Sequence, residues 1–358
     1  MPPRENTMAT TLRALPQPTL EILSIDAIRS TLARSKSIVL ADPVLSRVAF
    51  PHSAMFYPLG FPLRLSTNCE DILDLARDLW SAFKHEFDVP TIQLEFGVAD
   101  GPARECPPTP TSRIRRHVCS VIADGENFAI SDLSQGFSNV WTTRGVLEYP
   151  SYVRYFLLES TALCQIATRF TTPVHAACVA LDGCGILLCG DSGAGKSTLS
   201  YACAQAGWTY VTDDGSFLVH GREDGLVAGN YTKFRFRPSA EALFPELHGR
   251  ETIRRAGKGK PSVEVSTELT HGIKTSPTAH ARFIVFLNRR TDGRQELIPF
   301  PKDVARYFML QQLCNVPNFQ CQQEEMVDQL LERDAFELCY GDLDWAIERL
   351  ARLAHEGS

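Results

Sequence analysis

The chain has 358 residues, of which 44% are hydrophobic and 22% are charged, a composition typical of a globular protein with one large or two medium domains. Its net charge of −6 argues against binding to nucleic acid or to an anionic membrane through bulk electrostatics. No apolar run approaches the roughly eighteen residues of a membrane-spanning helix, and the N-terminus lacks the apolar core of a secretory signal. We therefore expect a cytoplasmic protein that binds neither nucleic acid nor membrane, with a flexible N-terminus at residues 1–23.

Residues 24–150 mix short β-like runs with one helical stretch and predict a smaller α+β N-terminal region without a recognisable chemical motif. The helical stretch covers residues 68–87, with Asn68 as its expected N-cap and two acidic residues in its first turn. A proline-rich break follows at residues 107–110. The expected strands are residues 38–40, 92–96 and 117–122.

A core is predicted over residues 151–300. Residues 149–170 have helical spacing, and Pro150 falls at the start, where a helix tolerates it. We expect this helix to pack on the core that follows. Next come two strands, residues 175–181 and 185–189, joined by Asp182-Gly183, which predicts a β-hairpin.

The second hairpin strand leads through a glycine-rich turn into a helix at residues 199–206, and Gly207 ends that helix before a strand at residues 208–212. A strand–helix–strand of this kind is a right-handed βαβ unit with a ligand site at the carboxyl ends of its strands. The fold class is therefore α/β with a mixed sheet and a helical C-terminus at residues 301–358. Further strands are expected at residues 217–220, 232–236 and 283–287, and C-terminal helices at residues 302–313, 324–333 and 342–355.

The glycine-rich turn reads GDSGAGKST and follows a short apolar strand, so it matches the phosphate-binding pattern G-x-x-x-x-G-K-[ST] in its proper setting. Backbone N–H groups of such a loop wrap a phosphate at a helix N-terminus. Lys196 is expected to reach the β- and γ-phosphates of ATP or GTP, and the Ser197 hydroxyl to ligate Mg²⁺. The predicted nucleotide-binding residues of the loop are Gly190, Asp191, Ser192, Gly193, Ala194, Gly195, Lys196, Ser197 and Thr198.

Asp213 and Asp214 end the strand that follows the loop helix. Adjacent carboxylates on a strand point to opposite sides, so one can hold the metal while the other faces a phosphoryl acceptor. The alternative is an ordinary Asp-Asp-Gly turn.

Three further features of the sequence are candidates. His175 starts the hairpin, where a lone histidine is most often structural. Arg235 and Arg237 share one face of a strand with phenylalanines on the other, and they can face the phosphates or solvent. A basic stretch, RRAGKGKP, can likewise be a loop over the phosphates or a solvated surface loop; its charged residues are Arg254, Arg255, Lys258 and Lys260.

Eleven cysteines are scattered along the chain, and none forms a C-x-x-C pair. Cys178, Cys184, Cys189 and Cys203 lie in apolar strand or helix contexts, which favours reduced cysteines that act as small hydrophobic residues. A zinc site or a disulfide framework is the alternative.

The segment VHAACVALDGCGILLCGDSGAGKSTLSYACAQAGWTYVTDD resembles the catalytic domain of the HPr kinase/phosphorylase family, bacterial serine kinases with a PEP-carboxykinase-like P-loop core. The resemblance extends over residues 173–247. Two stretches typical of the family, E-I-R-G-L-G and I-P-V-[RK]-P-G-R-N, are absent. The chain is therefore similar to divergent, HPr-kinase-related members.

The resemblance implies roles for four residues. It makes His175 an active-site residue near the phosphates, Lys196 a phosphate ligand, Ser197 a Mg²⁺ ligand, and one aspartate of the pair the base for an acceptor serine. We assign that base to Asp214 and the second metal contact to Asp213.

These observations predict an ATP- and Mg²⁺-dependent kinase whose acceptor is a hydroxyl, a serine of a peptide or small protein. A small-molecule kinase on the same core is one alternative. The other is a nucleotide-sensing protein that transfers no phosphoryl group, although a sensor has no need of Asp214. The sequence leaves the acceptor's identity and a homo-oligomeric state open.

Overall fold

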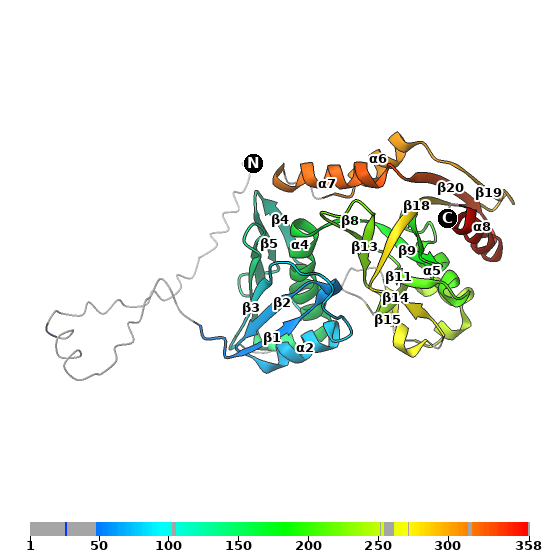
Figure 1. Ribbon diagram of the computed structural model, residues 1–358. Coiled ribbons are helices and arrows are strands. Elements are labelled where there is room, and N and C mark those ends of the chain that lie inside the picture. The colour runs from blue at the N-terminus through cyan, green and yellow to red at the C-terminus, as the bar shows by residue number, and fades with distance from the viewer. Residues whose placement is uncertain are drawn as a thin grey trace, which may run out of the picture. The chain divides into compact units, whose positions relative to one another are not determined.

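A computed structural model describes residues 26, 48–101, 105–250, 252–253, 261–270, 272–313 and 317–356. The chain divides into two units, residues 1–47 and 48–358, and only the second is described here. This unit has a mixed α/β fold with parallel and antiparallel strand pairs and a helical C-terminus (Figure 1). The strand expected at residues 38–40 and the N-terminus at residues 1–23 lie outside the described residues. No helix among the described residues is long and apolar enough to cross a membrane.

Seven strands of the N-terminal region form one sheet in the order β1-β2-β3-β7-β6-β5-β4. The pairs β2–β3 and β3–β7 are parallel, and the other pairs are antiparallel. The strands predicted at residues 92–96 and 117–122 are confirmed, but most of this sheet was not predicted. Its strands are β1 (His52–Phe56), β2 (Leu63–Thr67), β3 (Ile92–Ala99), β4 (Thr111–Arg115), β5 (Val118–Ile122), β6 (Phe128–Asp132) and β7 (Phe137–Thr143).

Helix α2 (Glu70–Trp80) covers this sheet and is shorter than the predicted helix, which was expected to run to residue 87. The expected N-cap was wrong as well: Cys69 holds that position and makes no side-chain cap bond. Asn68 instead donates from Nδ2 to the carbonyl of Val98 at 2.9 Å and accepts from the N–H of Val98 at 2.8 Å. Its amide side chain thus ties the start of α2 to the end of β3.

The predicted helix at residues 149–170 is present but is not a uniform α-helix. Pro150 begins α3 (Pro150–Tyr152), a seven-residue π-helix follows (η3, Val153–Glu159), and α4 (Ser160–Arg169) completes it. Its buried side chains, Val153, Leu157 and Ile166 among them, join the hydrophobic core under the N-terminal sheet. The expectation that this helix packs on the core that follows holds only in part, because α4 also contacts β8, and Val219, Leu226 and Ala228 belong to the same hydrophobic cluster.

A ten-stranded sheet forms the centre of the unit, with the path β17-β11-β9-β10-β18-β13-β12-β8 and with β20 and β19 joined beyond β18. A three-stranded sheet, β14-β16-β15, lies apart from it. The strands of the large sheet are β8 (Thr171–Val174), β9 (Ala176–Leu181), β10 (Cys184–Cys189), β11 (Thr209–Thr212), β12 (Ser216–Val219), β13 (Leu226–Gly229), β17 (Lys274–Thr275), β18 (Thr278–Arg289), β19 (Glu296–Pro299) and β20 (Asp334–Tyr340); those of the small sheet are β14 (Lys233–Phe236), β15 (Thr252–Ile253) and β16 (Ser262–Ser266).

The predicted β9–β10 hairpin is confirmed, and both Asp182 and Gly183 of its turn have positive φ angles, 49° and 83°. Strands β10 and β11 run in the same direction, but they are not neighbours as the predicted βαβ unit required. Strand β9 lies between them, antiparallel to both. The carboxyl ends of β10 and β11 and the start of β9 consequently lie at one edge of the sheet.

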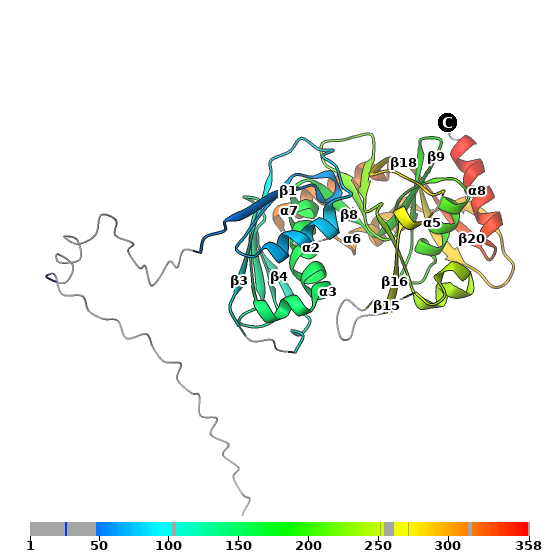
Figure 2. The ribbon, with the colours of Figure 1, turned by 90° about the horizontal axis from the view of Figure 1, so that it is seen from below.

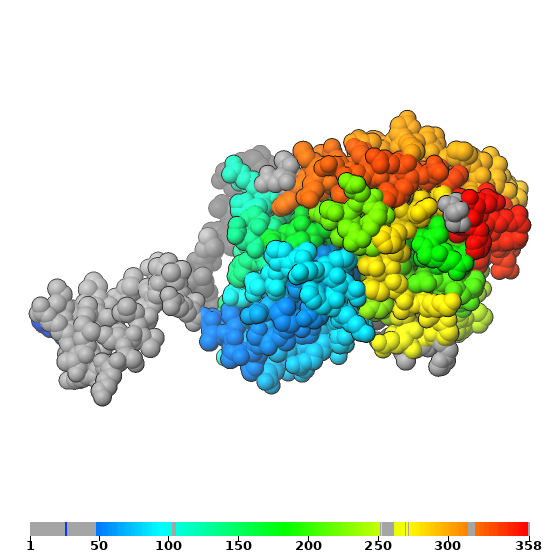
Figure 3. All heavy atoms as spheres, viewed as in Figure 1, coloured from blue at the N-terminus to red at the C-terminus, as the bar shows by residue number. Residues whose placement is uncertain are grey.

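Helices cover both faces of this sheet (Figures 1 and 2). Along β10, Ile186 and Leu188 pack with α5 and α8, and Leu187 and Cys189 pack with α6 and α7. A strand buried on both faces needs a continuous apolar run, which is what β10 has. In Figure 3 the side chains of α6 and α7 form an orange layer along one side. These helices are α5 (Lys196–Gln205), α6 (Lys302–Leu310), α7 (Pro317–Leu330) and α8 (Leu343–Glu356).

The C-terminal helices were predicted, but strand β20 between α7 and α8 was not. It pairs in parallel with β18 inside the large sheet. The described cysteines form no disulfide, and Cys178, Cys189 and Cys203 are fully buried. Short helical turns complete the unit: η1 (Pro58–Gly60), η2 (Arg144–Glu148), η4 (Pro238–Ala242), η5 (Pro245–Leu247) and η6 (Thr267–Leu269).

Candidate active site

The glycine-rich loop, residues 190–198, leaves the end of β10 and enters α5. Gly190, Gly193 and Gly195 all have positive φ, at 147°, 103° and 101°. A Cβ atom on Gly195 would lie 2.5 Å from the hydroxyl of Tyr340, so this position has no room for a side chain. Gly195 is also the N-cap of α5, and no side chain caps the helix there. The first N–H groups of α5 therefore lack a helical or capping partner and point toward the loop.

Lys196 is the first residue of α5 and is buried, with 6% of its surface exposed. Its Nζ donates to the carbonyl oxygens of Gly190 and Asp191, at 2.7 and 3.3 Å, and lies 3.1 Å from Nε2 of His175. Burial lowers the pKa of Lys196, and the carboxylate of Asp214 opposes that shift. The ammonium group thus stands inside the loop, held by groups that an anionic ligand can replace.

His175 lies between β8 and β9, at the sheet edge where the glycine-rich loop begins. Its backbone N–H donates to Oε1 of Gln312, and its Nδ1 lies 3.3 Å from Oδ1 of Asp214. Because an ammonium group can only donate, Nε2 accepts from Lys196, and the proton of the neutral ring then lies on Nδ1, facing Asp214. One imidazole therefore joins the lysine of the loop to this carboxylate.

Asp213 and Asp214 follow β11, which ends at Thr212, so both lie in a bend and not on the strand as predicted. Their carboxylates nevertheless have different partners. Asp214 faces His175, and its side chain is 53% exposed. Asp213 is buried, and its Oδ2 accepts from the backbone N–H of Arg235 at 2.8 Å. Burial raises the pKa of Asp213 to about 6, although the N–H and charge of Arg235 oppose the rise.

The two arginines of the β14 segment lie in different places. Arg237 reaches the glycine-rich loop, where its Nη2 donates to the Ser192 hydroxyl at 2.6 Å. Arg235 is directed away from the loop and pairs through Nε with Glu264 on β16, at 2.9 Å. The predicted alternation is confirmed, since Phe234 and Phe236 are buried on the opposite face. The basic stretch with Arg254, Arg255, Lys258 and Lys260 lies outside the described residues.

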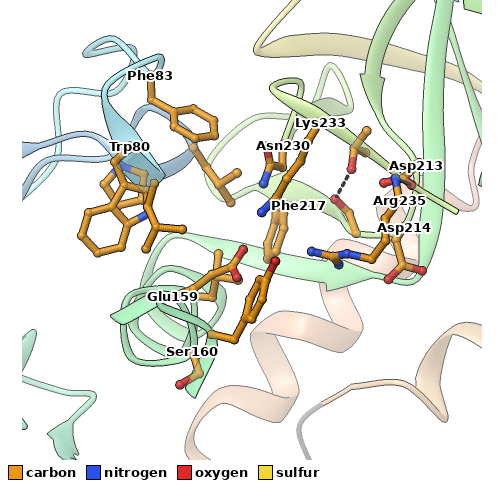
Figure 4. Close-up of a pocket in the computed structure, with 17 residues that line it drawn as sticks. Trp80, Phe83, Glu159, Ser160, Asp213, Asp214, Phe217, Asn230, Lys233 and Arg235 are labelled. Carbon is orange, nitrogen blue, oxygen red and sulfur yellow. Dashed lines mark hydrogen bonds between the residues drawn. The ribbon is translucent and has the colours of Figure 1, made fainter. Parts of the chain in front are cut away.

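A pocket of about 270 Å³, which we call the Asp-Asp pocket, begins at Asp213 and Asp214 and extends toward the N-terminal region (Figure 4). Its far wall consists of aromatic and apolar side chains of α2 and its surroundings, and its middle is lined by charged residues. The lining residues used below are Leu79, Trp80, Phe83, Tyr155, Glu159, Lys233 and Arg235.

A second pocket, of about 310 Å³, lies beside the loop and is lined by Gly195, Thr198, Arg289, Tyr340 and Asp342, among others. The Asp-Asp pocket and this loop pocket share no lining residue. The two pockets are thus separate. His175 contacts the glycine-rich loop through Lys196, and its other partner, Asp214, lines the Asp-Asp pocket.

Of the predicted site residues, His175 contacts both Lys196 and Asp214, and Arg237 contacts the loop at Ser192. Arg235 pairs with Glu264 instead. Sequence reasoning missed the pocket's own residues, Trp80, Phe83, Tyr155 and Glu159. The helical spacing of residues 149–170 could have shown that Tyr155 and Glu159 share a face, but nothing in it indicates a π-helix.

Mg²⁺ is usually held by one or two protein ligands together with waters and substrate phosphates. Accordingly, the candidate ligands here are the hydroxyl of Ser197 at the start of α5 and the carboxylate of Asp213. No group of three or more His, Cys, Asp or Glu residues that could hold a metal occurs among the residues that the structure describes.

No protein-family model matches the sequence, and no curated protein matches it. Among solved structures, the Hpr(Ser) kinase/phosphatase from Coxiella burnetii is similar over 52% of this chain and 99% of its own, with 15% sequence identity and a TM-score of 0.28. A likeness this slight defines neither the fold nor the activity of the present chain. The resemblance to the HPr kinase family therefore stays a prediction, and the site has to be judged by its own residues.

Proposed function

We propose that this chain is a kinase that transfers the γ-phosphoryl group of Mg·ATP to a hydroxyl, a serine of a peptide or small protein. The observation that carries the proposal is the placement of His175, whose two ring nitrogens contact Lys196 of the glycine-rich loop and Asp214 of the Asp-Asp pocket. A phosphate-binding lysine and a carboxylate suited to deprotonate an acceptor thereby stand on the two sides of one imidazole.

The loop residues fit a nucleotide. The uncapped N–H groups at the start of α5, the ammonium of Lys196 and the guanidinium of Arg237 place donors and positive charges at the glycine-rich loop, as a bound phosphate would require. We assign the nucleoside to the loop pocket lined by Tyr340 and Asp342. Ser197 and Asp213 would hold the Mg²⁺, which neutralises phosphate charge during transfer.

The acceptor would lie in the Asp-Asp pocket. Asp214 takes the proton of the acceptor hydroxyl, the hydroxyl oxygen forms a bond to the γ-phosphorus, and the bond from that phosphorus to the bridging oxygen of ADP breaks. His175 orients the Asp214 carboxylate through its Nδ1–H. Half of Asp214 is exposed, so the carboxylate is accessible to a hydroxyl in the pocket.

A direct test is incubation of the purified protein with γ-³²P-labelled ATP, Mg²⁺ and an extract of its source cells, followed by separation of labelled peptides and proteins from labelled small molecules. Wild-type protein should label a specific polypeptide, and Lys196→Ala should lower both the affinity for a fluorescent ATP analogue and the labelling by at least roughly tenfold. Label in a small molecule alone would support a small-molecule kinase. Tight binding of Mg·ATP without transfer or hydrolysis would favour a nucleotide sensor.

A further inference from the structure

The middle of the Asp-Asp pocket carries an unusual backbone feature, the π-helix η3. Its hydrogen bonds run from residue i to i+5, and such segments occur often at functional sites. This π-helix ends at Glu159, which lines the pocket (Figure 4), and Tyr155 of the same segment lines it as well. A widened helical turn thus presents a phenol and a carboxylate to the same hollow.

The positive charges of the pocket already have a partner. Glu264 lies 3.4 Å from Nζ of Lys233 and 2.9 Å from Nε of Arg235, and its Oε1 also accepts from the Tyr155 hydroxyl at 2.6 Å. Burial would raise the pKa of Glu264, but Lys233 and Arg235 outweigh burial and hold the pKa below its ordinary value. The Glu264 carboxylate therefore stays charged and occupies both cations.

Glu159 lacks such a partner. Among the described residues, no side-chain or backbone donor forms a hydrogen bond with its carboxylate, and no Lys, Arg or His nitrogen lies within ion-pair distance of it. Its side chain is only partly accessible and is directed into the pocket (Figure 4). Burial raises the pKa of Glu159 despite the more distant charges of Lys233 and Arg235. The oxygen atoms of this carboxylate therefore remain available to accept hydrogen bonds from a ligand in the pocket.

The charge balance also favours a cation as the ligand of this hollow. The pocket is lined by three carboxylates, Glu159, Asp213 and Asp214, and by the two cations that Glu264 already occupies. An anionic ligand would have to break those ion pairs, while a cationic one would find a free carboxylate. Beyond Glu159, Leu79, Trp80 and Phe83 offer an apolar wall that suits the methylene groups of a long cationic side chain.

We propose that the Asp-Asp pocket recognises a cationic group of the acceptor, with Glu159 as its counter-ion, so that the acceptor carries a lysine, an arginine or a terminal amine close to the hydroxyl that is phosphorylated. This inference rests on the kinase function proposed above. Glu159 acts as a specificity-determining residue: it selects the acceptor and takes no part in the transfer itself. Lys233 and Arg235 line the same pocket, and their ion pairs with Glu264 leave Glu159 unpaired.

The test uses blocked seven-residue peptides with a single central serine and Lys, Met or Glu scanned through the flanking positions. Binding to the full-length protein is measured by fluorescence anisotropy without ATP, and phosphoryl transfer is measured separately with labelled ATP. We expect the best Lys peptide to bind at least roughly tenfold tighter than its Met counterpart. Glu159→Gln should reduce that ratio to below about threefold, and Glu159→Asp should retain most of it.

The matched control is Glu325→Gln, which removes one negative charge from an exposed position of α7 and should leave the ratio unchanged. Thermal unfolding of each variant confirms that it is folded. Equal binding of the three peptide classes, a preference for Glu peptides, no binding at all, or a Lys preference that survives in Glu159→Gln would each overturn the proposal. If the Lys peptides bind as expected and receive no phosphate, the cation site stands and the kinase function fails.

Discussion

Nδ1 of His175 lies 3.3 Å from Oδ1 of Asp214, while Nε2 of the same ring lies 3.1 Å from Nζ of Lys196. Asp214 is therefore fixed in direction by a residue that also touches the glycine-rich loop. If the loop holds ATP, ligand binding on one side of the ring bears on the carboxylate at the other side. The predictions below test this arrangement one group at a time.

Removal of the His175 imidazole should slow phosphoryl transfer in a protein that still folds. We expect His175→Ala to slow phosphoryl transfer by roughly 10- to 100-fold, because Asp214 loses its orienting donor and Lys196 loses one of its contacts. The exposed His248, whose Nδ1 lies 2.9 Å from the carbonyl oxygen of Pro245, provides the control, and His248→Ala should transfer at the wild-type rate. Initial rates at saturating ATP measure both. Equal rates for the two variants would show that His175 is merely structural.

Asp214→Asn changes the proposed base while nearly preserving its shape. Affinity for ATP should stay within about threefold of wild type, because Asp214 is not part of the loop, and transfer should fall by roughly 10²- to 10⁴-fold. Equilibrium binding of a fluorescent ATP analogue and single-turnover transfer rates separate the two effects. Transfer at the wild-type rate would assign Asp214 another role.

The proposed metal site makes activity depend on a divalent cation. EDTA should abolish nucleotide turnover, and Ser197→Ala should raise the Mg²⁺ concentration needed for half-maximal activity by roughly tenfold through the loss of one oxygen ligand. Ser200→Ala serves as the matched control. The Ser200 hydroxyl is buried in α5 and donates to the carbonyl of Ser197, so it is not a candidate metal ligand. Full turnover without divalent cation would contradict the assignment.

Asp213 predicts a specific pH dependence of stability. Its pKa is about 6 in the folded protein and about 3.9 in an unfolded chain, because burial disfavours the charged form. The folded state thus binds this proton more tightly than the unfolded chain does, and proton binding at Asp213 adds to the unfolding free energy. This contribution is complete below about pH 4 and is lost as the pH rises through about 6. The loss amounts to on the order of 3 kcal/mol of unfolding free energy.

Asp213→Asn carries no titrating proton and shows the effect by comparison. Without Mg²⁺, the unfolding free energy of wild type relative to the variant should fall between pH 4.5 and pH 7.5, as measured by urea denaturation. A difference between the two proteins that does not vary with pH would exclude a raised pKa at Asp213.

Much of the central fold could be predicted because its signals are local. The apolar run of β10, the Asp182-Gly183 turn and the Gly207 stop each depend on a few adjacent residues. The order of the strands in the sheet depends instead on residues far apart in the sequence. For that reason the position of β9 between β10 and β11 was not predicted, although the strand itself was. Strand β20 was missed because a strand covered on both faces and placed between two helices resembles a helical segment in periodicity.

The site divides in the same way. The grouping of His175, Lys196 and Asp214 was predicted from a short stretch of sequence, and the structure places these residues in contact. The Asp-Asp pocket could not be predicted, because Trp80 and Glu159 approach Asp213 only through tertiary packing. Arg235 shows the limit of periodicity: its face was predicted correctly, but its partner, Glu264, comes from a strand that no pattern had indicated.

The position of β9 between β10 and β11 has a consequence for how the protein can change. The glycine-rich loop, His175 and both aspartates all come from residues 175–214. These groups are therefore brought together by contacts between segments that are close in sequence. The opposite wall of the Asp-Asp pocket comes from residues 58–83 and 155–163. If the Asp-Asp pocket holds the acceptor as proposed, substitutions in those distant segments would change which acceptor binds and leave the residues of the glycine-rich loop as they are.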